Sequence, residues 1–336
     1  MAVDDVLLDG FVRLLTQISP PTTVRRAEDD GDAAGILRDV EESGFMDALV
    51  PESRGGSGLS LDDVVPLFLA AGAHLLPIPF AETMVGRAMI AAAGAQFPPG
   101  RTIVLWPAAR AGRLLSQVDP LCERSSLALV QRGTEFRLLP IKVGDRCTDP
   151  FRMWSARPEL NASPLAAFEL PNVDLLHWAA AITAANMAGA MERLLGLSLA
   201  HVNDRQQFGR SIGKFQAIQQ QLSVFAERTV AARVAARIGL TGSTWTLDGR
   251  RVAIAKSIAN ESARASLSIA HAVHGAIGIS EAHDLQLYTR RLARWQVSFG
   301  SDAYWQRYLG GSRLKSRETT SVDFVRTVMA DPLTYG

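Results

Sequence analysis

The chain has 336 residues and a mass of 36.3 kDa, which is enough for two or three domains with a sizeable core. Hydrophobic residues make up 47% and charged residues 21% of it, and the formal net charge is +1. This balance is that of a globular protein and does not indicate nucleic acid or an acidic surface as a partner. Cys122 and Cys147 are too few for a disulfide framework and too isolated for a metal cluster.

Residues 1 to about 100 carry apolar side chains at helical spacing. The pattern predicts helices around residues 6–15, 32–43, 61–72 and 81–93. Gly44 is placed as the residue that ends the second helix, and Ser60 as the N-cap of the third. Pro66 lies inside that third helix and favours a kink.

Residues 101 to 172 have a different character. Short β-type runs occupy residues 102–105, 126–130, 136–139 and 166–170, and prolines separate them. They predict a small β-domain.

The sequence is helical again from residue 174 to about residue 309. Four long helices are predicted, at 174–204, 214–240, 248–274 and 283–299, which together form a four-helix bundle. Small residues at Ala181, Ala185 and Gly189 permit another helix to approach the first one closely. The second carries the alternating three-four spacing of a packing seam, at Phe215, Ile218, Leu222, Phe225, Thr229, Ala232 and Ala236.

The connection between the first two bundle helices, residues 205–216, stands out. Two glycines and Ser211 predict a loop, and Lys214 beside the start of the next helix predicts an anion site. Phe208 and Phe215 offer apolar faces, and Gln216 an amide. A nucleotide cofactor with a pyrophosphate would suit this set, although an Arg near a helix end with a Gly after it is also ordinary C-capping.

Three blocks of this sequence, in the right order, resemble the acyl-CoA dehydrogenase family. The first runs from Ser43-Gly44-Phe45 through Val50-Pro51-Glu52 to Gly55-Gly56-Ser57-Gly58. The second is Arg205-x-x-Phe208-Gly209 followed by Phe215-Gln216. The third is His274-Gly275-Ala276-Ile277-Gly278, which continues to Leu287-Tyr288-Thr289-Arg290-Arg291.

The resemblance implies a mainly α fold with a small β-domain and FAD as the cofactor. Its parts would be an N-terminal helical domain (1–100), a truncated middle β-domain (101–172) and a C-terminal four-helix bundle (173–336). In the family the second block reaches the ADP half of an FAD that the neighbouring subunit mainly holds. The cofactor-binding residues carried over are Arg205, Gln207, Phe208, Phe215, Gln216, Gly275 and Gly278.

The chain departs from the family where the chemistry would occur. The family places its catalytic Glu at one of two positions, which fall here on Ala179 and Phe299. Neither side chain can take a proton, so no catalytic residue is expected in this chain. The family's flavin-ring motifs in the β-domain are not recognisable, and Ala272 and Ala276 replace a Gln and a Gly of the third block.

Other sites were weighed and set aside. His271, His274 and His283 lie near Glu281 and Asp284 and could suggest a metal, but the family block that contains them binds none, so no metal is expected. The sequence shows no hydrolase elbow, P-loop or dinucleotide-binding glycine motif.

The amino terminus turns acidic after Val3 and does not resemble a secretory signal. The longest apolar run, from Trp178 to Met191, is shorter than the ~20 residues that a bilayer requires. A cytoplasmic protein without membrane insertion is therefore expected.

The leading hypothesis is a short subunit that lends FAD-binding residues to a catalytic acyl-CoA dehydrogenase chain, with an acyl-CoA as substrate and a separate electron-transfer acceptor. One alternative is a self-sufficient homodimer that uses a displaced carboxylate, at Glu261, Glu281 or Asp284. The other is a flavin-free structural or acyl-CoA-binding protein on the same scaffold.

Overall fold

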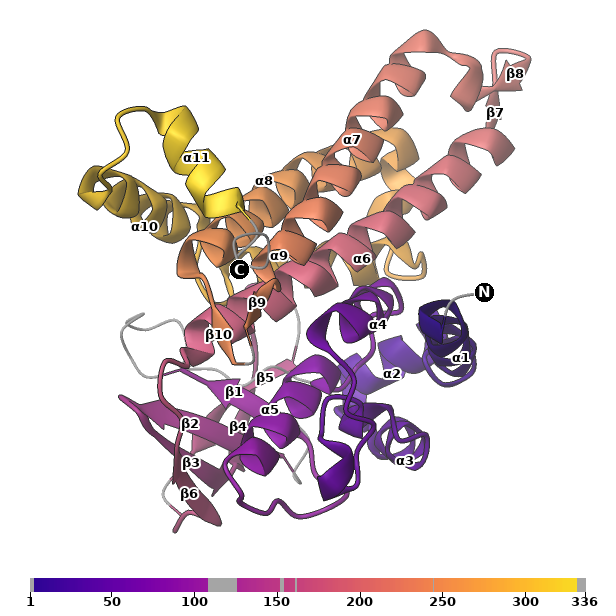
Figure 1. Ribbon diagram of the computed structural model, residues 1–336. Helices are drawn as coiled ribbons and strands as arrows, with labels where there is room; N and C mark the ends of the chain where they lie inside the picture. The colour runs from indigo at the N-terminus through magenta and orange to yellow at the C-terminus, as the bar shows by residue number, and fades with distance from the viewer. Residues whose placement is uncertain (1–2, 108–125, 152–153, 161, 244, 331–336) are drawn as a thin grey trace.

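The computed structural model describes residues 3–107, 126–151, 154–160, 162–243 and 245–330. The chain is mainly helical with a small sheet, as the sequence predicted (Figure 1). The N-terminal helices and the sheet lie side by side on one side of a long helix bundle, whose far end projects beyond them.

The N-terminal part contains five α-helices and two 3₁₀ turns. They are α1 (Val3–Ile18), α2 (Pro21–Asp30), α3 (Ala34–Glu42), η1 (Phe45–Asp47), η2 (Glu52–Arg54), α4 (Leu61–Ala73) and α5 (Phe80–Ala92). Ser60 caps α4 in a capping box with Asp63, and Gly44 adopts the left-handed conformation just beyond α3, as predicted. α2 was not predicted; it begins with Pro21 at N1 and is ended by Gly31 at a φ of 70°.

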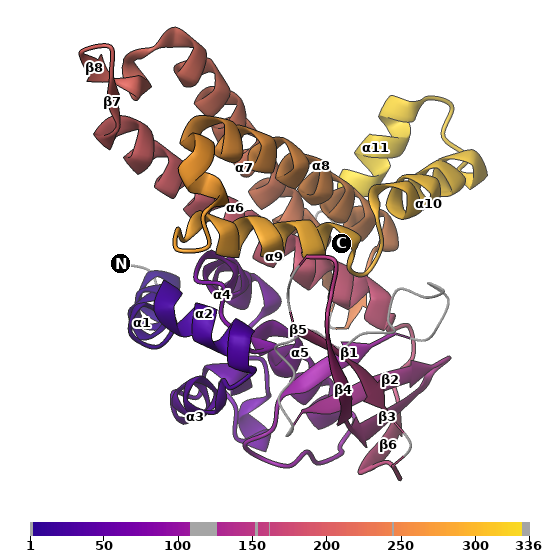
Figure 2. The ribbon, with the colours of Figure 1, turned by 180° about the vertical axis from the view of Figure 1, so that it is seen from behind.

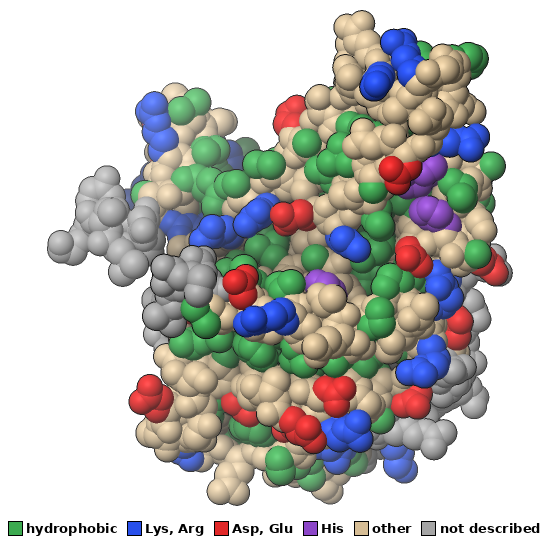
Figure 3. Space-filling view, turned by 90° about the vertical axis from the view of Figure 1, so that its right-hand side faces the viewer, with side chains coloured by type: hydrophobic (Ala, Val, Ile, Leu, Met, Phe, Trp, Pro, Cys, Tyr) green, Lys and Arg blue, Asp and Glu red, His purple; other side chains and the backbone are tan. Residues whose placement is uncertain are grey.

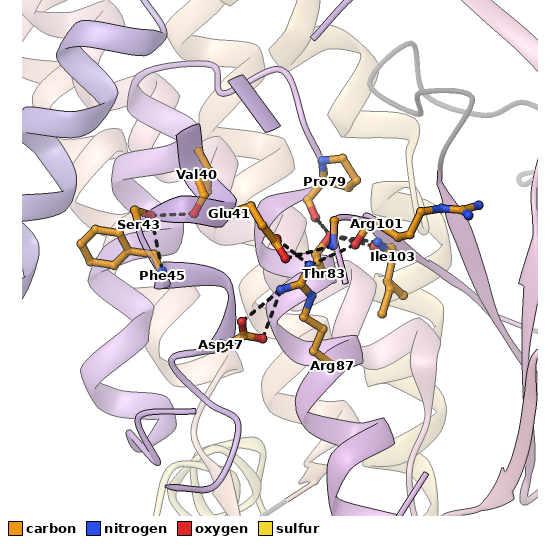
Figure 4. A network of polar contacts seen from close by, with 11 residues as sticks. Val40, Glu41, Ser43, Phe45, Asp47, Pro79, Thr83, Arg87, Arg101 and Ile103 are labelled. Atoms are coloured by element: carbon orange, nitrogen blue, oxygen red, sulfur yellow. Dashed lines mark hydrogen bonds and ion pairs between the residues drawn. The ribbon is translucent and has the colours of Figure 1, made fainter. Parts of the chain in front are cut away.

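Arg87 of α5 holds this part together (Figure 4). Its side chain is 1% exposed and pairs with Glu41 at 2.7 Å and with Asp47 at 3.1 Å. It also donates to the carbonyl oxygen of Arg101 at 3.2 Å, so one buried cation links α3, η1 and the segment that leads into the sheet. A buried charge is tolerated only when it is paired in this way.

The sheet contains the four predicted strands in the order β1-β2-β3-β6. They are β1 (Ile103–Trp106), β2 (Leu127–Arg132), β3 (Glu135–Pro140) and β6 (Ala166–Glu169). β1 and β2 pair in parallel, and the other two pairs are antiparallel. A second hairpin, β4 (Lys142–Thr148) and β5 (Trp154–Glu159), was not predicted, because its polar sequence does not alternate.

The four-helix bundle was predicted correctly. It consists of α6 (Leu175–Asp204), α7 (Gln216–Gly239), α8 (Gly249–His274) and α9 (Leu285–Val297). Short turns join the helices: β7 (Gln206–Gln207), β8 (Arg210–Ser211), η4 (Ile212–Lys214), β9 (Gly242–Ser243), β10 (Thr246–Leu247) and η5 (Gly275–Ile279). Helix continues past residue 309, through α10 (Asp302–Lys315) and α11 (Ser321–Met329).

The predicted seam of α7 is buried from Leu222 to Ala236. Phe215 and Ile218, which the spacing also assigned to the seam, are only partly buried. They lie where α7 begins, at the projecting end of the bundle, and line a surface pocket there.

The bundle and the N-terminal helices share one continuous hydrophobic core. α4 packs directly on α6, and a Cβ added to Gly189 would collide with the carbonyl oxygen of Leu69. On the other side α9 is the bundle helix that faces the N-terminal helices (Figure 2), and its Arg290 and Arg291 pair with the buried Glu28 of α2. Across the described ranges, every helix is too short or too polar to cross a bilayer.

Candidate functional site

The loop between α6 and α7 is a tight hairpin. β7 and β8 pair across Phe208 and Gly209, whose φ angles are 52° and 76°. Two positive φ angles at the tip match the right-handed twist of a two-residue hairpin, and they suit Gly but strain Phe. Ser211 fastens the hairpin to α6 by donating to the carbonyl oxygen of Val202 at 2.8 Å.

A pocket of about 580 Å³ lies between this hairpin, the start of α7 and the end of α8. Histidine side chains lie beside one another beneath the projecting end of the molecule (Figure 3). The lining residues are His201, Arg205, Gln207, Phe208, Ile212, Phe215, Ala217, Ile218, Ala272, Val273, His274, Gly275 and Ala276. The second and third sequence blocks, far apart in the chain, therefore meet in one site.

Five of the seven predicted cofactor residues line this pocket, namely Arg205, Gln207, Phe208, Phe215 and Gly275. The other two, Gln216 and Gly278, are not among the lining residues.

Gln216 is exposed as the first residue of α7, between two lining residues. Gly278 is buried beneath the pocket, where an added Cβ would press against Leu285 and His274, so its role in the structure is close packing. Gly275 has a φ of 61° and open space above its Cα, which leaves its backbone accessible.

The pocket can receive an anion. Arg205 is exposed, and its guanidinium has no hydrogen-bond or ion-pair partner among the described residues. α7 begins at Gln216 without a side-chain N-cap, so its first N–H groups add positive potential. Lys214, predicted at the helix start, lies two residues earlier in η4. Arg210 stacks on the ring of Phe215 with its guanidinium carbon 4.2 Å from the centroid.

The floor of the pocket contains a pair of histidines that the sequence analysis did not bring together. The rings of His201 and His274 stack with centroids 4.3 Å apart, and His283 meets His274 edge-on at 5.3 Å. Burial and the neighbouring histidines lower the pKa of His274 to about 4. No trio of His, Cys, Asp or Glu within the described ranges has an arrangement that could hold a metal ion.

The two positions that would carry a base lie outside this pocket's lining. Ala179 is fully buried in α6. Phe299 lies between α9 and α10 with a φ of 53°, and its carbonyl oxygen accepts from Trp305 Nε1 at 3.0 Å. Lys256 supports this turn by donating to Trp295 O at 2.8 Å, and burial lowers its pKa to about 7.

Comparison with known proteins identifies the chain. The model of the family "Acyl-CoA dehydrogenase, C-terminal domain" matches residues 146–314, half of the sequence. The chain belongs to the acyl-CoA dehydrogenase family.

Two relatives named as acyl-CoA dehydrogenases match most of the chain. The acyl-CoA dehydrogenase IpdE2 of Mycolicibacterium smegmatis is 26% identical over 306 residues, which cover 85% of this chain and 91% of that protein. FadE34 of Mycobacterium tuberculosis is 28% identical over 289 residues, covering 79% of this chain but 40% of that protein.

Two solved structures share the fold. The ChsE4-ChsE5 complex from Mycobacterium tuberculosis matches with a TM-score of 0.73 at 19% identity, over 95% of this chain and 99% of the matched chain. A variant of the Tcur3481-Tcur3483 steroid ACAD matches with a TM-score of 0.73 at 21% identity, over 92% of this chain and 97% of the matched chain.

Members of this family normally bind FAD, and the pocket's side chains fit its nucleotide half. An unpartnered cation suits a phosphate, exposed aromatic faces suit an adenine, and the accessible backbone at Gly275 permits close approach. The buried Nε2 of His274 has no partner among the described residues, which also indicates a missing ligand.

The carboxylates that could replace the family base are engaged or exposed. Glu261 is 59% exposed and pairs with Arg228 at 3.1 Å. Asp284 pairs with Arg25 at 3.0 Å, and Glu281 is exposed. A general base for an α-proton needs a desolvated carboxylate, and none of these three side chains is buried.

Proposed function

We propose that this chain is a subunit of an FAD-dependent acyl-CoA dehydrogenase whose catalytic base is carried by a partner chain. The observation that carries the proposal is the contrast between two regions. The pocket at the bundle end retains Arg205 with exposed aromatic faces, whereas positions 179 and 299 hold a methyl group and a phenyl ring. A chain of this kind can bind a nucleotide but cannot remove an α-proton.

The chain's own residues would hold the ADP half of FAD. Bound FAD supplies the hydride acceptor for α,β-desaturation of an acyl-CoA thioester. Arg205 would neutralise a phosphate, and Phe208 and Phe215 would cover the adenine. Gln207 and Gln216 offer amides at the hairpin and at the start of α7, and Gly275 allows the backbone to approach.

The proposed partner is a catalytic acyl-CoA dehydrogenase subunit that seats on the same end of the bundle. Large apolar side chains there are unusually exposed: Leu199, Phe208, Ile277 and Ile279, at 43%, 91%, 49% and 77%. Two structural neighbours are two-component proteins by their titles, and one of them is a steroid ACAD. We therefore propose a bulky, steroid-type acyl-CoA as substrate, with electrons passing to a separate acceptor.

The role of Arg205 provides the test of the nucleotide site. In a complex of this chain with a catalytic acyl-CoA dehydrogenase chain, Arg205→Ala should weaken FAD retention about 10- to 100-fold, because a charge-assisted hydrogen bond is lost. The measurement is the FAD dissociation constant from fluorescence of the apo complex on reloading.

Arg233→Ala is the matched control, since Arg233 is a surface arginine of α7 that pairs with Glu192 at 3.5 Å away from the pocket lining. It should leave FAD affinity unchanged. Equal FAD affinities for the Arg205 variant and the unaltered complex would show that the pocket does not bind the cofactor. A complex without any flavin would instead support a flavin-free acyl-CoA-binding protein.

A further inference from the structure

His274 is the last residue of α8 and lies at the pocket with 6% of its surface exposed. Its Nδ1 atom is 2.8 Å from the carbonyl oxygen of Ala270. Because a carbonyl oxygen can only accept, Nδ1 must carry the proton of this contact. In the neutral ring, Nε2 therefore presents a lone pair.

That lone pair is unsatisfied. Nε2 is buried and has no hydrogen-bond partner within the described ranges. The stacked ring of His201, tilted by only 20°, covers the face of His274, whereas a hydrogen bond to Nε2 must come in the plane of the ring. His283 uses its own Nδ1 to accept from the backbone of Leu285. Buried polar atoms in proteins nearly always have partners, so a missing donor is indicated.

The chemistry of that donor is restricted. Burial and the neighbouring His201, His283 and His271 lower the pKa of His274 to about 4, so Nε2 remains an acceptor at neutral pH. An acceptor lone pair repels phosphate oxygens, which leaves these to Arg205 in the same lining. A neutral hydroxyl or amine is the complement that Nε2 requires.

We propose that His274 determines the ligand specificity of this pocket, with Nε2 accepting a hydrogen bond from a hydroxyl or amine on the nucleoside part of the bound nucleotide. The inference rests on the proposed nucleotide-binding function. Nε2 has almost no exposed surface, so a neighbouring side chain must give way for the donor to reach it.

The test is a comparison of ligands and variants with the full chain, alone and in its complex, by isothermal titration calorimetry. ADP is compared with 2′-deoxy-ADP and 3′-deoxy-ADP, which each lack one sugar hydroxyl, and with inosine 5′-diphosphate, which lacks the exocyclic amine. One of the three analogues should bind the unaltered protein about 2- to 10-fold more weakly than ADP does, as expected for the loss of one neutral hydrogen bond.

His274→Phe keeps an aromatic ring for stacking but removes the acceptor, and should bind ADP and that analogue equally. His274→Gln offers an acceptor at a similar reach and should restore part of the difference. His201→Ala should preserve the difference, because the acceptor remains.

The experiment distinguishes a failure of the inference about His274 from a failure of the proposed function. If ADP binds and the unaltered protein and His274→Phe show the same pattern across the analogues, His274 has no part in specificity and the inference is overturned. If ADP binds neither preparation, the nucleotide site of the proposed function fails, and the inference fails with it.

Discussion

Phe208 combines two unfavourable properties in a single residue. Its φ of 52° places a bulky side chain in the left-handed region, and 91% of its surface is exposed. A non-glycine residue in that region costs free energy, and an exposed phenyl ring contributes little to folding in return. Contact with a ligand or a partner chain accounts for an aromatic residue at this position better than the stability of the chain itself does.

Replacing Phe208 with Gly should separate stability from binding. The free energy of unfolding should stay the same or rise by up to about 1 kcal/mol, because Gly adopts a positive φ without strain. FAD retention in the complex should fall about 10-fold, since stacking on a base contributes roughly 1–3 kcal/mol. Urea unfolding and flavin reloading measure the two effects.

Phe225→Ala, in the buried seam of the same helix, is the comparison for stability and should cost about 3–5 kcal/mol. A loss of similar size at position 208, or unaltered flavin retention, would contradict the assignment of Phe208 to a binding role.

At the scale of the helices and strands, segments with a regular apolar pattern were predictable, whereas the polar α2 and the polar β4–β5 hairpin were not. The bundle helices α6 to α9 and the strands β1, β2, β3 and β6 follow clear apolar patterns. α2, the β4–β5 hairpin and α11 were not predicted, and contacts with distant parts of the chain hold α2 and α11. Arg251 of α8, for example, donates to the carbonyl oxygen of Val328 at 2.8 Å and so holds the end of α11.

Some residues of the pocket could likewise be predicted from the sequence and others could not. Arg205, Phe208 and Phe215 are close in sequence and could be grouped by their spacing. His201 and His274 come from different helices, and only the packing of α6 against α8 stacks their rings. The signal that could have found the pair is modest: His201 lies four residues before Arg205, in the last turn of α6, which Arg205 caps.

The close approach of α4 and α6 gives a prediction about glycines. Gly189→Ala should destabilise the chain by roughly 3 kcal/mol, because the added methyl group would meet the carbonyl oxygen of Leu69 and the helices would have to separate. Gly196→Ala is the matched control on α6. Its Cβ would enter open space, so it should stabilise the chain by up to about 1 kcal/mol. Chemical denaturation compares them, and equal effects at both positions would contradict the tight packing of α4 on α6.

The whole molecule retains the architecture of its family. The pocket at the bundle end and the two positions expected for the catalytic base differ in what they retain. One core joins the N-terminal helices, the sheet and the bundle. The pocket at the bundle end is lined by Arg205, Phe208 and Phe215, which we propose hold a nucleotide. Position 179 is filled by core packing, and position 299 lies in a turn that Lys256 and Trp305 hold in place.

The most direct test of the subunit assignment is to measure flavin content and acyl-CoA oxidation for this chain purified alone and for its complex with a catalytic acyl-CoA dehydrogenase chain. We expect no stoichiometric flavin and no turnover for the chain alone, and both for the complex, with turnover lost when the catalytic glutamate of the partner chain is replaced by glutamine. A preparation of this chain by itself that contains stoichiometric FAD and oxidises an acyl-CoA would contradict it.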